Sequence, residues 1–351
     1  MRLLILTNRP DCLGENDAPI GNAFVRFGWQ VIIGEINAIA ADDYRFFTRG
    51  VLIAEGAKPH HVGAAAQGIR GSYFLDECEL IWVINPPQPR VARDIWQLLW
   101  LASQHMNFVN SIAGMMFLDT KHALGHVVPK ENRVISYTSN DFSWLWERYR
   151  ESPDLSWVAK PPNGYSGQNV FLLPSGGPNI RTILQSLTGN ADVQGQFGTL
   201  AQHEFAPATQ DGSAYGLGGL KAEYAILQQY IPEVAHGEKR IVVVCGQVVA
   251  WHGRKGRPDD HRSNIAQGGK PIQVELHDGE IELAESVGKR LMTHGINFVG
   301  IDMAFPYVLE LNIADAGGLY DSELATGKDR SDQVAELIIS HFKNNWRHDT
   351  H

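Results

Sequence analysis

The sequence is poor in cysteine and in long hydrophobic runs. Its three cysteines, Cys12, Cys78 and Cys245, lie far apart and have no metal-ligand or redox spacing. A sparse, odd cysteine count is typical of a reducing cytoplasm. The apolar run at residues 3–6 is too short for a signal peptide, and no stretch approaches the length of a membrane span. We therefore predict a soluble, cytoplasmic protein with no membrane partner.

An excess of positive charge and several familiar catalytic motifs are also absent. The 351 residues have a formal charge of −9, which argues against nonspecific nucleic-acid binding by the whole surface. The loop after the first apolar run contains no Gly-x-Gly-x-x-Gly, so a dinucleotide-binding fold has no local support. Neither a Gly-x-Ser-x-Gly elbow nor a Cys/His nucleophile pattern occurs. The net charge does not exclude a local basic site.

The chain is long enough for two or three lobes, and its patterns divide it into three. Residues 1–126 alternate short buried-type strands with helical stretches, which predicts an α/β lobe built on a parallel sheet. Residues 127–231 predict a central lobe with a strand hairpin and a polar insertion at 190–220. Residues 232–351 predict a C-terminal lobe with two antiparallel hairpins, a helix between them and a closing helix.

The last predicted hairpin places acidic side chains together. Apolar runs at 298–303 and 308–311 flank Pro306, and antiparallel pairing about that residue sets Asp302 opposite Glu310. Asn312 then projects from the same face as Glu310. Opposed like charges are unfavourable unless neutralised, and oxygen ligands of this kind suit Mg²⁺. A solvent-facing side of an edge hairpin is the alternative, and these residues alone leave it open.

Two further segments are rich in groups that bind anions. Lys160 ends a strand just before the loop Gly164-Tyr-Ser166-Gly167, whose small residues let backbone N–H groups approach an anion. A long loop from Arg254 to Gly269 concentrates cationic side chains in an otherwise acidic chain. It is open to three interpretations: a solvated loop, a nucleic-acid contact without aromatic residues for stacking, or a cover for a polyphosphate. Neither Asp302 nor Lys160 is expected to belong to the core.

Taken in order, these segments resemble the ATP-grasp ligases, most closely the bacterial glutathione synthetase type. The resemblance covers residues 121–312 and is carried by six matching pieces: Lys121, Val158–Gly167, Leu227–Pro232, Gly237–Arg240, Arg262-Ser-Asn264 with Gly268-Gly269, and Gly300–Asn312. Each piece alone is weak evidence for the family, whereas six pieces in the family's order are specific evidence. The resemblance implies an ATP-grasp fold with an N-terminal α/β lobe.

The resemblance also implies roles for individual residues. ATP phosphates would be held by Lys121, Lys160 and the loop residues Gly164, Ser166 and Gly167. The hinge beside the adenine would consist of Gln228, Gln229, Tyr230 and Ile231, with Glu238 accepting from the ribose hydroxyls. The catalytic residues Arg240, Arg254 and Asn264 would stabilise a phosphorylated carboxylate. Asp302, Glu310 and Asn312 would bind Mg²⁺, or Mn²⁺ in its place.

Members of this family phosphorylate a carboxylate with ATP, and an amine then attacks the acylphosphate to give an amide, ADP and phosphate. The predicted substrates are therefore a small carboxylate, such as an amino acid or small peptide, and an amine. A kinase acting on a small carboxylate and a non-catalytic ATP-binding protein are the alternatives, and a homo-oligomer is left open. The sequence departs from the family after Asn312, where it continues with Ile-Ala-Asp315-Ala-Gly-Gly318 instead of a Ser-Pro pair. It also departs before the Pro-Pro pair at Pro86, where it has Val83-Ile-Asn85 instead of charged residues. Glutathione itself is therefore a doubtful product.

Overall fold

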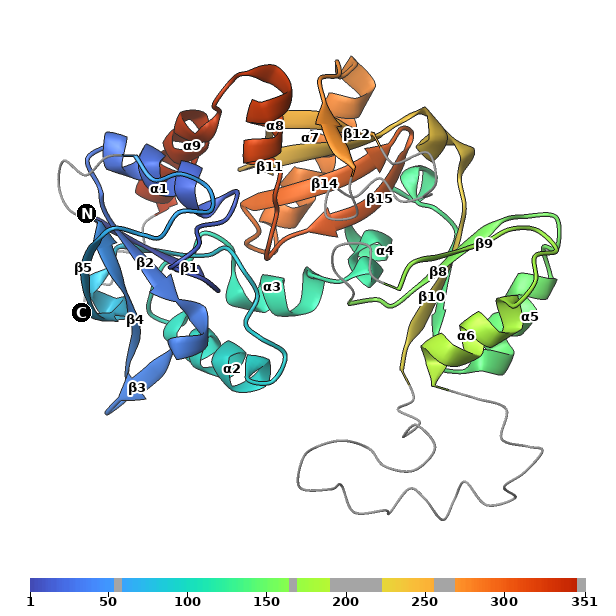
Figure 1. Ribbon diagram of the computed structural model, residues 1–351, viewed down its shortest axis with the longest axis horizontal. Coiled ribbons are helices and arrows are strands. Elements are labelled where there is room, and N and C mark those ends of the chain that lie inside the picture. Colours follow the sequence, from blue (N-terminus) through green and yellow to red (C-terminus); the bar gives the residue numbers. More distant parts are fainter. Residues whose placement is uncertain (54–58, 164–168, 190–222, 256–268, 346–351) are drawn as a thin grey trace, which may run out of the picture. The chain divides into compact units, whose positions relative to one another are not determined.

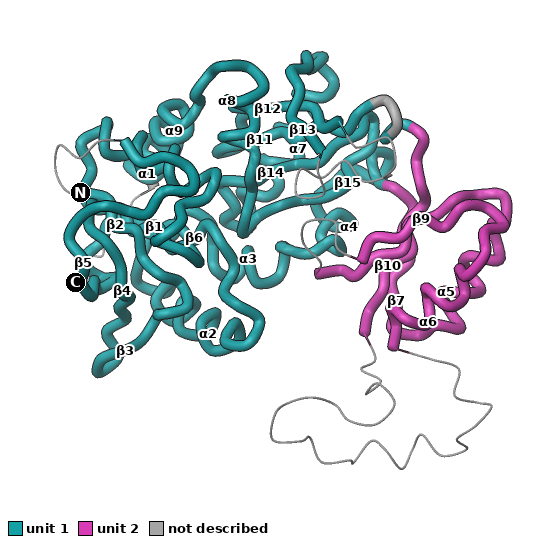
Figure 2. The backbone as a smooth tube through the Cα atoms, viewed as in Figure 1, with its two compact units in different colours: residues 1–133, 233–257, 268–351 teal, residues 134–232, 258–267 magenta. Residues whose placement is uncertain are grey.

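The computed structural model describes residues 1–53, 59–163, 169–189, 223–255 and 269–345. The chain divides into two compact units (Figure 2). Unit 1 comprises Met1–Arg133, Glu233–Arg257 and Gly268–His351, and unit 2 comprises Val134–Pro232 and Pro258–Gln267. Each unit has its own sheets and core, and the two are described separately. The division into three lobes stays a prediction.

The N-terminal sheet of unit 1 has a parallel centre. Strands β2 (Gln30–Glu35), β1 (Arg2–Thr7) and β6 (Leu80–Val83) lie side by side and run parallel. Helix α1 (Asp17–Arg26) connects β1 to β2, and α2 (Ala92–Ala102) follows β6. This is the α/β arrangement that the alternation of strands and helices predicts.

Three further strands make this sheet mixed rather than purely parallel. They are β3 (Ala40–Asp42), β4 (Arg45–Ile53) and β5 (Gly68–Phe74), and β4 pairs antiparallel with β2, β3 and β5. The prediction of a parallel sheet is incomplete here. Most side chains of β5 are exposed, so its sequence has no buried face from which a strand could be recognised.

The second sheet of unit 1 is antiparallel, with strand order β13-β12-β11-β14-β15. Its strands are β11 (Glu238–Val244), β12 (Gln247–Lys255), β13 (Lys270–Ile272), β14 (Phe298–Ala304) and β15 (Tyr307–Asn312). The two predicted hairpins are β11–β12, which turns at Cys245-Gly246, and β14–β15, which turns at Phe305-Pro306. Helices α7 (Asp278–Met292), α8 (Leu319–Thr326) and α9 (Ser331–Asn345) complete this part.

Figure 1 shows the strands and helices of unit 1. Alternating side chains in its two sheets contribute to two apolar clusters. Leu4 of β1 and Ile241 of β11 lie in the cluster that contains the buried faces of α2 and α7. Leu3 and Val242, their neighbours along the chain, lie in the cluster that contains α1 and α9. Because successive side chains of a strand point to opposite faces, one short apolar run supplies both clusters. The segment between the sheets forms α3 (Ile112–Leu118), a 3-10 turn at Lys121–Ala123 and α4 (Leu124–Val127).

Unit 2 contains a four-stranded antiparallel sheet with order β7-β10-β8-β9. Its strands are β7 (Ser136–Ser139), β8 (Trp157–Lys160), β9 (Phe171–Leu173) and β10 (Ala225–Gln229), and its helices are α5 (Phe142–Arg150) and α6 (Ile180–Thr188). Asp141 caps α5 by accepting from the amides of Ser143 and Trp144. Trp157, Leu145 and Leu184 are buried in the core between sheet and helices.

The predicted insertion at 190–220 lies outside the described residues. Within the described part of the chain, no helix is long and apolar enough to cross a membrane.

Candidate functional site

The register of the antiparallel sheet in unit 1 gathers charged residues on one face. Arg240 of β11 lies opposite Asp302 of β14, and Asp302 lies opposite Glu310 of β15, as the sequence predicts. On the other side of β11, Glu238 lies opposite Arg254 of β12. The residues between these positions, among them Ile241 and Ile301, pack in the cluster that contains α7. The charged face is therefore the face turned away from α7.

Asp302 is the centre of this cluster. Its carboxylate accepts from Arg240 Nε at 2.5 Å and Nη2 at 3.0 Å, and Arg254 Nη1 lies 3.2 Å from its second oxygen. Only 3% of the residue is exposed. Burial opposes ionisation of Asp302, but the charges of Arg240 and Arg254 outweigh it and hold the pKa well below its usual range. The interpretation as a solvent-facing edge is wrong for this residue, and so is the expectation that Asp302 lies outside the core.

Each of the other acidic groups in the cluster also has a cationic partner. Glu238 accepts from Arg254 Nη1 at 2.8 Å, and Glu310 Oε1 lies 3.1 Å from Lys121 Nζ. Glu238, Asp302 and Glu310 thus balance Arg240, Arg254 and Lys121 in charge. Such pairing is what allows several charges to share a poorly solvated site.

The loop after β15 encloses the Arg240 guanidinium. Arg240 Nη1 donates a short hydrogen bond to the carbonyl of Ala316. Gly300 of β14 lies beneath this loop, and a Cβ there would be 2.2 Å from the Ala316 carbonyl oxygen. Gly318 has φ +91, and a Cβ there would be 2.9 Å from Arg240 Cγ. Glycines at these positions let backbone approach the arginine closely.

The residues predicted to bind metal carry oxygen atoms of the kind that a hard cation such as Mg²⁺ prefers. The set combines the carboxylates of Asp302 and Glu310 with the carboxamide of Asn312, whose Nδ2 donates to Asp302 Oδ2 at 3.2 Å. In the described part of the chain, no group of three or more His, Cys, Asp or Glu side chains is placed to hold a metal by itself. A metal here would therefore depend on the amide oxygen of Asn312 or on ligands from outside the protein.

Unit 2 brings together two other predicted residues. Lys160 of β8 donates to Gln228 Oε1 at 2.9 Å, and Gln228 Nε2 donates to Ser136 Oγ at 3.0 Å. Lys160 is only 7% exposed, which corrects the expectation that it lies outside the core.

The other residues that the sequence predicts for the hinge lie in or just after β10. The amides of Gln229 and Tyr230 donate to the carbonyls of Ile135 and Ser156, and Ile231 is buried. Four predicted residues lie outside the described residues: Gly164, Ser166, Gly167 and Asn264. Most of the cationic loop from Arg254 to Gly269 lies there as well.

Sequence reasoning missed several groups beside the cluster. Asp119 Oδ1 accepts from the amides of Ile313 and Ala314 at 3.1 and 3.4 Å, which fixes the chain just after Asn312. The one feature of the sequence that could have indicated Asp119 is its position two residues before Lys121.

His252 is fully buried beneath the loop, and both ring nitrogens lack a hydrogen-bond partner. Burial, followed by the charges of Arg254 and Arg240, lowers the pKa of His252 to about 3, so its ring is neutral.

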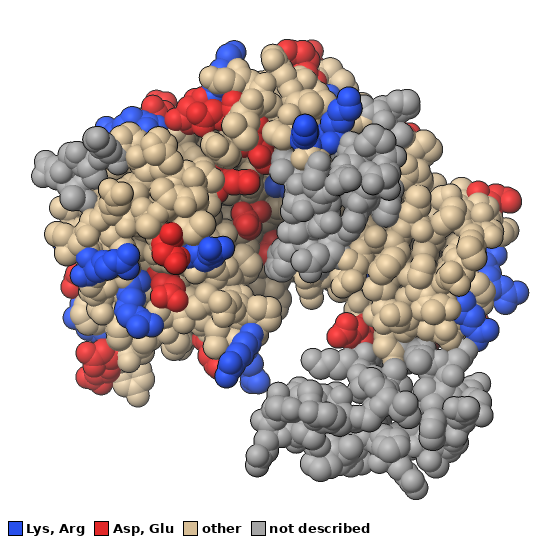
Figure 3. All heavy atoms as spheres, in the orientation of Figure 1, with Lys and Arg blue, Asp and Glu red and all other residues tan. Residues whose placement is uncertain are grey.

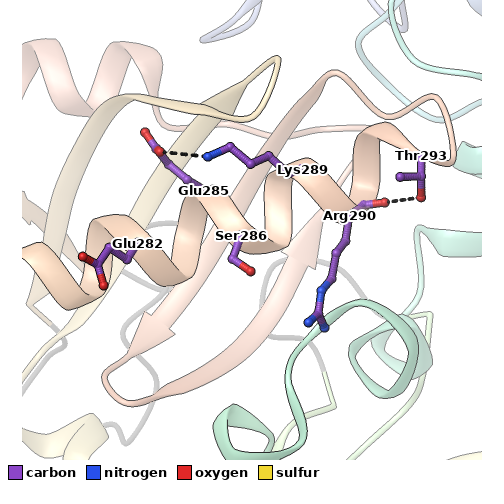
Figure 4. Close-up of a pocket in the computed structure, with 6 residues that line it drawn as sticks. All are labelled: Glu282, Glu285, Ser286, Lys289, Arg290 and Thr293. Atoms are coloured by element: carbon purple, nitrogen blue, oxygen red, sulfur yellow. Dashed lines mark hydrogen bonds and ion pairs between the residues drawn. The ribbon is translucent and has the colours of Figure 1, made fainter.

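A surface depression on α7 has no connection with this cluster (Figure 4). Figure 4 shows the side chains that line it on the outer side of the helix, where Lys289 pairs with Glu285 at 3.4 Å. The buried side of α7 faces the sheet with Leu283, Val287 and Leu291. We assign no chemistry to the depression.

Comparison with known proteins places these residues in a family context. Residues 217–326 match the family described as prokaryotic glutathione synthetase, ATP-grasp domain. The chain is 25% identical over 339 residues to the glutathione synthetase of Gloeobacter violaceus, covering 92% of this chain and 90% of that protein. It is 34% identical over 113 residues to the glutathione synthetase of Rhodopseudomonas palustris, but this match covers 32% of this chain and 36% of the relative. Its match to the glutathione synthetase of a Prochlorococcus marinus strain, at 27% identity, covers 50% of that relative.

Solved structures agree with the fold. D-cycloserine synthetase superposes with a TM-score of 0.62 at 14% identity, covering 97% of this chain and 99% of the other. An ATP-grasp protein with a RimK domain from Sphaerobacter thermophilus superposes with a TM-score of 0.56 at 15% identity, covering 96% and 99%. At these identities the likeness concerns the fold.

The protein has the ATP-grasp fold, as predicted. Residues 217–326 match the ATP-grasp domain of prokaryotic glutathione synthetase, and the chain is similar to one bacterial glutathione synthetase over 92% of its length.

Proposed function

We propose that the protein is an ADP-forming ligase that joins a carboxylate to an amine. In the first step a carboxylate oxygen attacks the γ-phosphorus of ATP, which forms an acylphosphate and releases ADP. In the second step the amine attacks the acyl carbon, loses a proton, and releases inorganic phosphate. The observation that carries this proposal is the buried cluster of Arg240, Arg254 and Asp302 within a domain of the glutathione synthetase type. Fixed guanidinium groups stabilise the negative charge of such transition states.

The ligands of the reaction are assigned to the residues that the sequence predicts for them. Asp302, Glu310 and Asn312 would hold Mg²⁺, or Mn²⁺, which when bound neutralises charge between the carboxylate and the γ-phosphate. Arg240, Arg254 and Asn264 would bind the acylphosphate, and Glu238 the ribose hydroxyls. The phosphates of ATP are assigned to Lys121, Lys160 and the loop residues Gly164, Ser166 and Gly167. Gln228, Gln229, Tyr230 and Ile231 would line the adenine.

The hydrogen bonds of the hinge limit how it can contact adenine. The N–H groups of Gln229 and Tyr230 already donate to carbonyls of unit 2. Adenine contacts from these two residues would therefore use their carbonyl groups or side chains. Lys160 would release Gln228 when it turns to a phosphate.

The proposed substrates are small molecules, with an amino acid or small peptide as the carboxylate. The relatives are named glutathione synthetase, which supports this size class. Asp315 stands beside the proposed acylphosphate residues in place of the Ser-Pro pair of the family, so we do not assign glutathione as the product. The absence of a membrane-spanning helix from the described residues and three free cysteines support a cytoplasmic enzyme.

A turnover assay tests the proposal. The purified protein is given Mg-ATP with amino acids, γ-glutamyl dipeptides and amines, singly and in pairs, and ADP is measured. ADP should form at a substantial rate only when an acid and an amine are both present, and mass spectrometry should find their amide. A phosphorylated acid without amide would make the protein a kinase instead. Binding of ATP with no ADP from any pair would make it a non-catalytic ATP-binding protein.

Glu310→Gln is the variant best suited to this assay. Glu310 is partly exposed, so the change removes one charge from the proposed metal site while leaving the buried pairs of Asp302 intact. We expect loss of turnover with an unchanged fold. Glu282→Gln, on the exposed side of α7, removes one charge from a remote surface and should keep full activity.

A further inference from the structure

A second acidic group lies beside the charged sheet face, on the loop that follows β15 and on the segment that enters α1. It consists of Asp315, which follows β15, and of Glu15 and Asp17, which lie at the start of α1. Asp315 directly precedes Ala316, whose carbonyl accepts from Arg240. Figure 3 shows that Asp and Glu side chains gather on part of the visible face. The group thus adjoins the residues assigned to the acylphosphate.

Asp315 is open to solvent although protein surrounds it on most sides. Its two oxygens are approached by carboxamides alone, Asn16 Nδ2 at 3.5 Å and Asn85 Nδ2 at 3.4 Å. In the ranges that the structure describes, neither Asp315 nor Glu15 forms a salt bridge. This sets them apart from Asp302, Glu238 and Glu310, each of which has a cationic partner at 2.5–3.1 Å.

Unpartnered acceptors lie next to this carboxylate. Asn16 is 2% exposed and contacts Asp315 through Nδ2, yet its Oδ1 has no hydrogen-bond partner. Asn16 precedes α1 at the N-cap position, but its side chain makes no capping bond. Asp17 is equally buried, and its Oδ1 is unpartnered while Oδ2 accepts from Thr7 and Gly14. Buried acceptors without a donor are costly, so a ligand that donates hydrogen bonds would stabilise this arrangement.

The electrostatics of the group favour a cation. Burial, and then the negative charge of Asp17, raise the pKa of Asp315 to about 6. Partial burial, and then Asp321 and Asp315, raise the pKa of Glu15 to about 7. Arg240 opposes this effect on both carboxyl groups, but Asp302 and the Ala316 carbonyl already engage its guanidinium. A bound positive charge would relieve the mutual repulsion of these carboxylates.

We propose that Asp315, with Glu15 and the side-chain oxygen Oδ1 of Asn16, binds the ammonium group of the amine substrate. An ammonium group has three N–H donors and one positive charge, which match a carboxylate and an unpartnered amide oxygen. This assignment rests on the proposed ligase function and specifies one of its substrates. The amine would bind here as a cation, beside the residues assigned to the acylphosphate. It would have to lose one proton before its nitrogen attacks the acyl carbon.

The same charges restrict the class of amine. A carboxylate close to the ammonium group, as in an α-amino acid, would lie against Asp315, Glu15 and Asp17 and be repelled. The preferred acceptor is therefore an alkylamine or a diamine that has no carboxylate near its amino group.

Three probes of one length test this subsite without turnover. The full chain, in saturating Mg²⁺, is titrated calorimetrically with 1,3-diaminopropane, 3-aminopropan-1-ol and 3-aminopropanoate. These carry two positive charges, one positive charge, and one charge of each sign. We expect affinity to fall in that order. Binding of 3-aminopropanoate as tight as that of 3-aminopropan-1-ol would overturn the proposal. Diamine binding that occurs only in a parallel titration without Mg²⁺ would also overturn it, since the group would then be a metal site.

Two variants localise the binding. Asp315→Asn should weaken diamine binding by about tenfold or more, because it removes a charged hydrogen-bond acceptor. Glu15→Gln, at an exposed position, should weaken it by a smaller factor, and it keeps the test decisive if the Asp315 variant fails to fold. Glu282→Gln on α7 is the matched control and should bind as the unaltered protein does. Unchanged diamine binding in both Asp315→Asn and Glu15→Gln would refute the assignment.

The turnover assay separates this proposal from the proposed function. If the diamine binds as expected but no acid and amine pair yields ADP, the subsite stands and the ligase assignment fails. If amide forms with 3-aminopropanoate as readily as with 3-aminopropan-1-ol, the ligase assignment stands and the subsite assignment fails.

Discussion

Asp302 is held by two guanidinium groups in a site that water barely reaches. Removing one partner of such a buried pair leaves the other charge without compensation, which costs far more than an exposed ion pair is worth. The hydrogen bonds from Arg240 and the contact of Arg254 thus make Asp302 a structural residue as well as a proposed metal ligand. Its variants must be interpreted with both roles in mind.

Asp302→Ala should lower the free energy of unfolding by about 3–5 kcal/mol, because Arg240 and Arg254 would remain buried and unpaired. Asp302→Asn keeps the shape and one acceptor oxygen, so we expect a smaller loss of stability together with loss of turnover. Urea unfolding and ADP release measured on both variants check this. Equal stability of Asp302→Ala and the unaltered protein would contradict the role of the arginines.

The carboxyl groups beside Asp315 predict a pH dependence of stability. The pKa of Asp315 rises from 3.8 to about 6 on folding, and that of Glu15 from 4.5 to about 7. The folded protein binds these protons more tightly, so their contribution is fully present below the unfolded values and is lost as pH rises through the folded ones. The free energy of unfolding should therefore carry a component that decreases between pH 4 and pH 7.

Asp315→Asn isolates that component, since an asparagine does not titrate in this range. Urea unfolding at several pH values should give a shallower decrease for Asp315→Asn than for the unaltered protein. Asp332, which pairs with Arg26 on the surface, offers the control, because Asp332→Asn should leave the slope unchanged. A slope that survives in Asp315→Asn would show that other groups cause it.

At the scale of elements, the hairpin β14–β15 and the loop after it act together. The hairpin sets Asp302 opposite Glu310, and the loop at 315–318 covers Arg240. Gly300 is the point where strand and loop meet, because its missing side chain leaves room for the Ala316 carbonyl. The loop can hold Arg240 only while that space stays free.

Gly300→Ala should therefore disturb the site by displacing the loop. A Cβ at 2.2 Å from a backbone oxygen cannot be accommodated without movement, and overpacking of this kind costs about 1–3 kcal/mol. We expect lower stability and a large fall in turnover. Gly125→Ala in α4 meets no atom within 4 Å and should be neutral or stabilising by up to about 1 kcal/mol. Thermal unfolding and ADP release of the two variants test the difference, and equal behaviour would contradict it.

At the scale of the whole molecule, the charge balance of the proposed site predicts how metal and nucleotide would bind. Asp302 and Glu310 already have cationic partners, so Mg²⁺ alone would have to compete with Arg240 and Lys121. A nucleotide would supply further oxygen ligands and occupy the cations, so metal and nucleotide should bind together.

Thermal unfolding in Mg²⁺, in ADP and in both tests this coupling. Mg²⁺ alone should change the Tm little, whereas Mg-ADP should stabilise the protein by about 2.7 kcal/mol when free nucleotide is about 100-fold above its Kd. A large shift with Mg²⁺ alone would show a metal site that is independent of nucleotide.

Most strands and helices were predictable because their signals are local. The apolar runs at β1, β2, β6, β8 and β14, the Gly246 turn and the buried side of α7 each predict their element from neighbouring residues. Even the pairing of Asp302 with Glu310 follows from local sequence, since antiparallel strands joined by a short turn can align in few ways. Strands β3, β4 and β5 escaped prediction because exposed residues and glycines give no alternation.

The sequence by itself determined the ATP-grasp fold and the hairpin that carries the proposed metal ligands, because ordered motifs and turn chemistry are properties of the chain. Only the tertiary structure decided which of these charged and polar side chains contact one another. Arg240 with Asp302, Lys121 with Glu310, and Asn16 with Asp315 join residues 62 to 299 positions apart. Such contacts depend on how sheets and loops pack, and no local pattern encodes them.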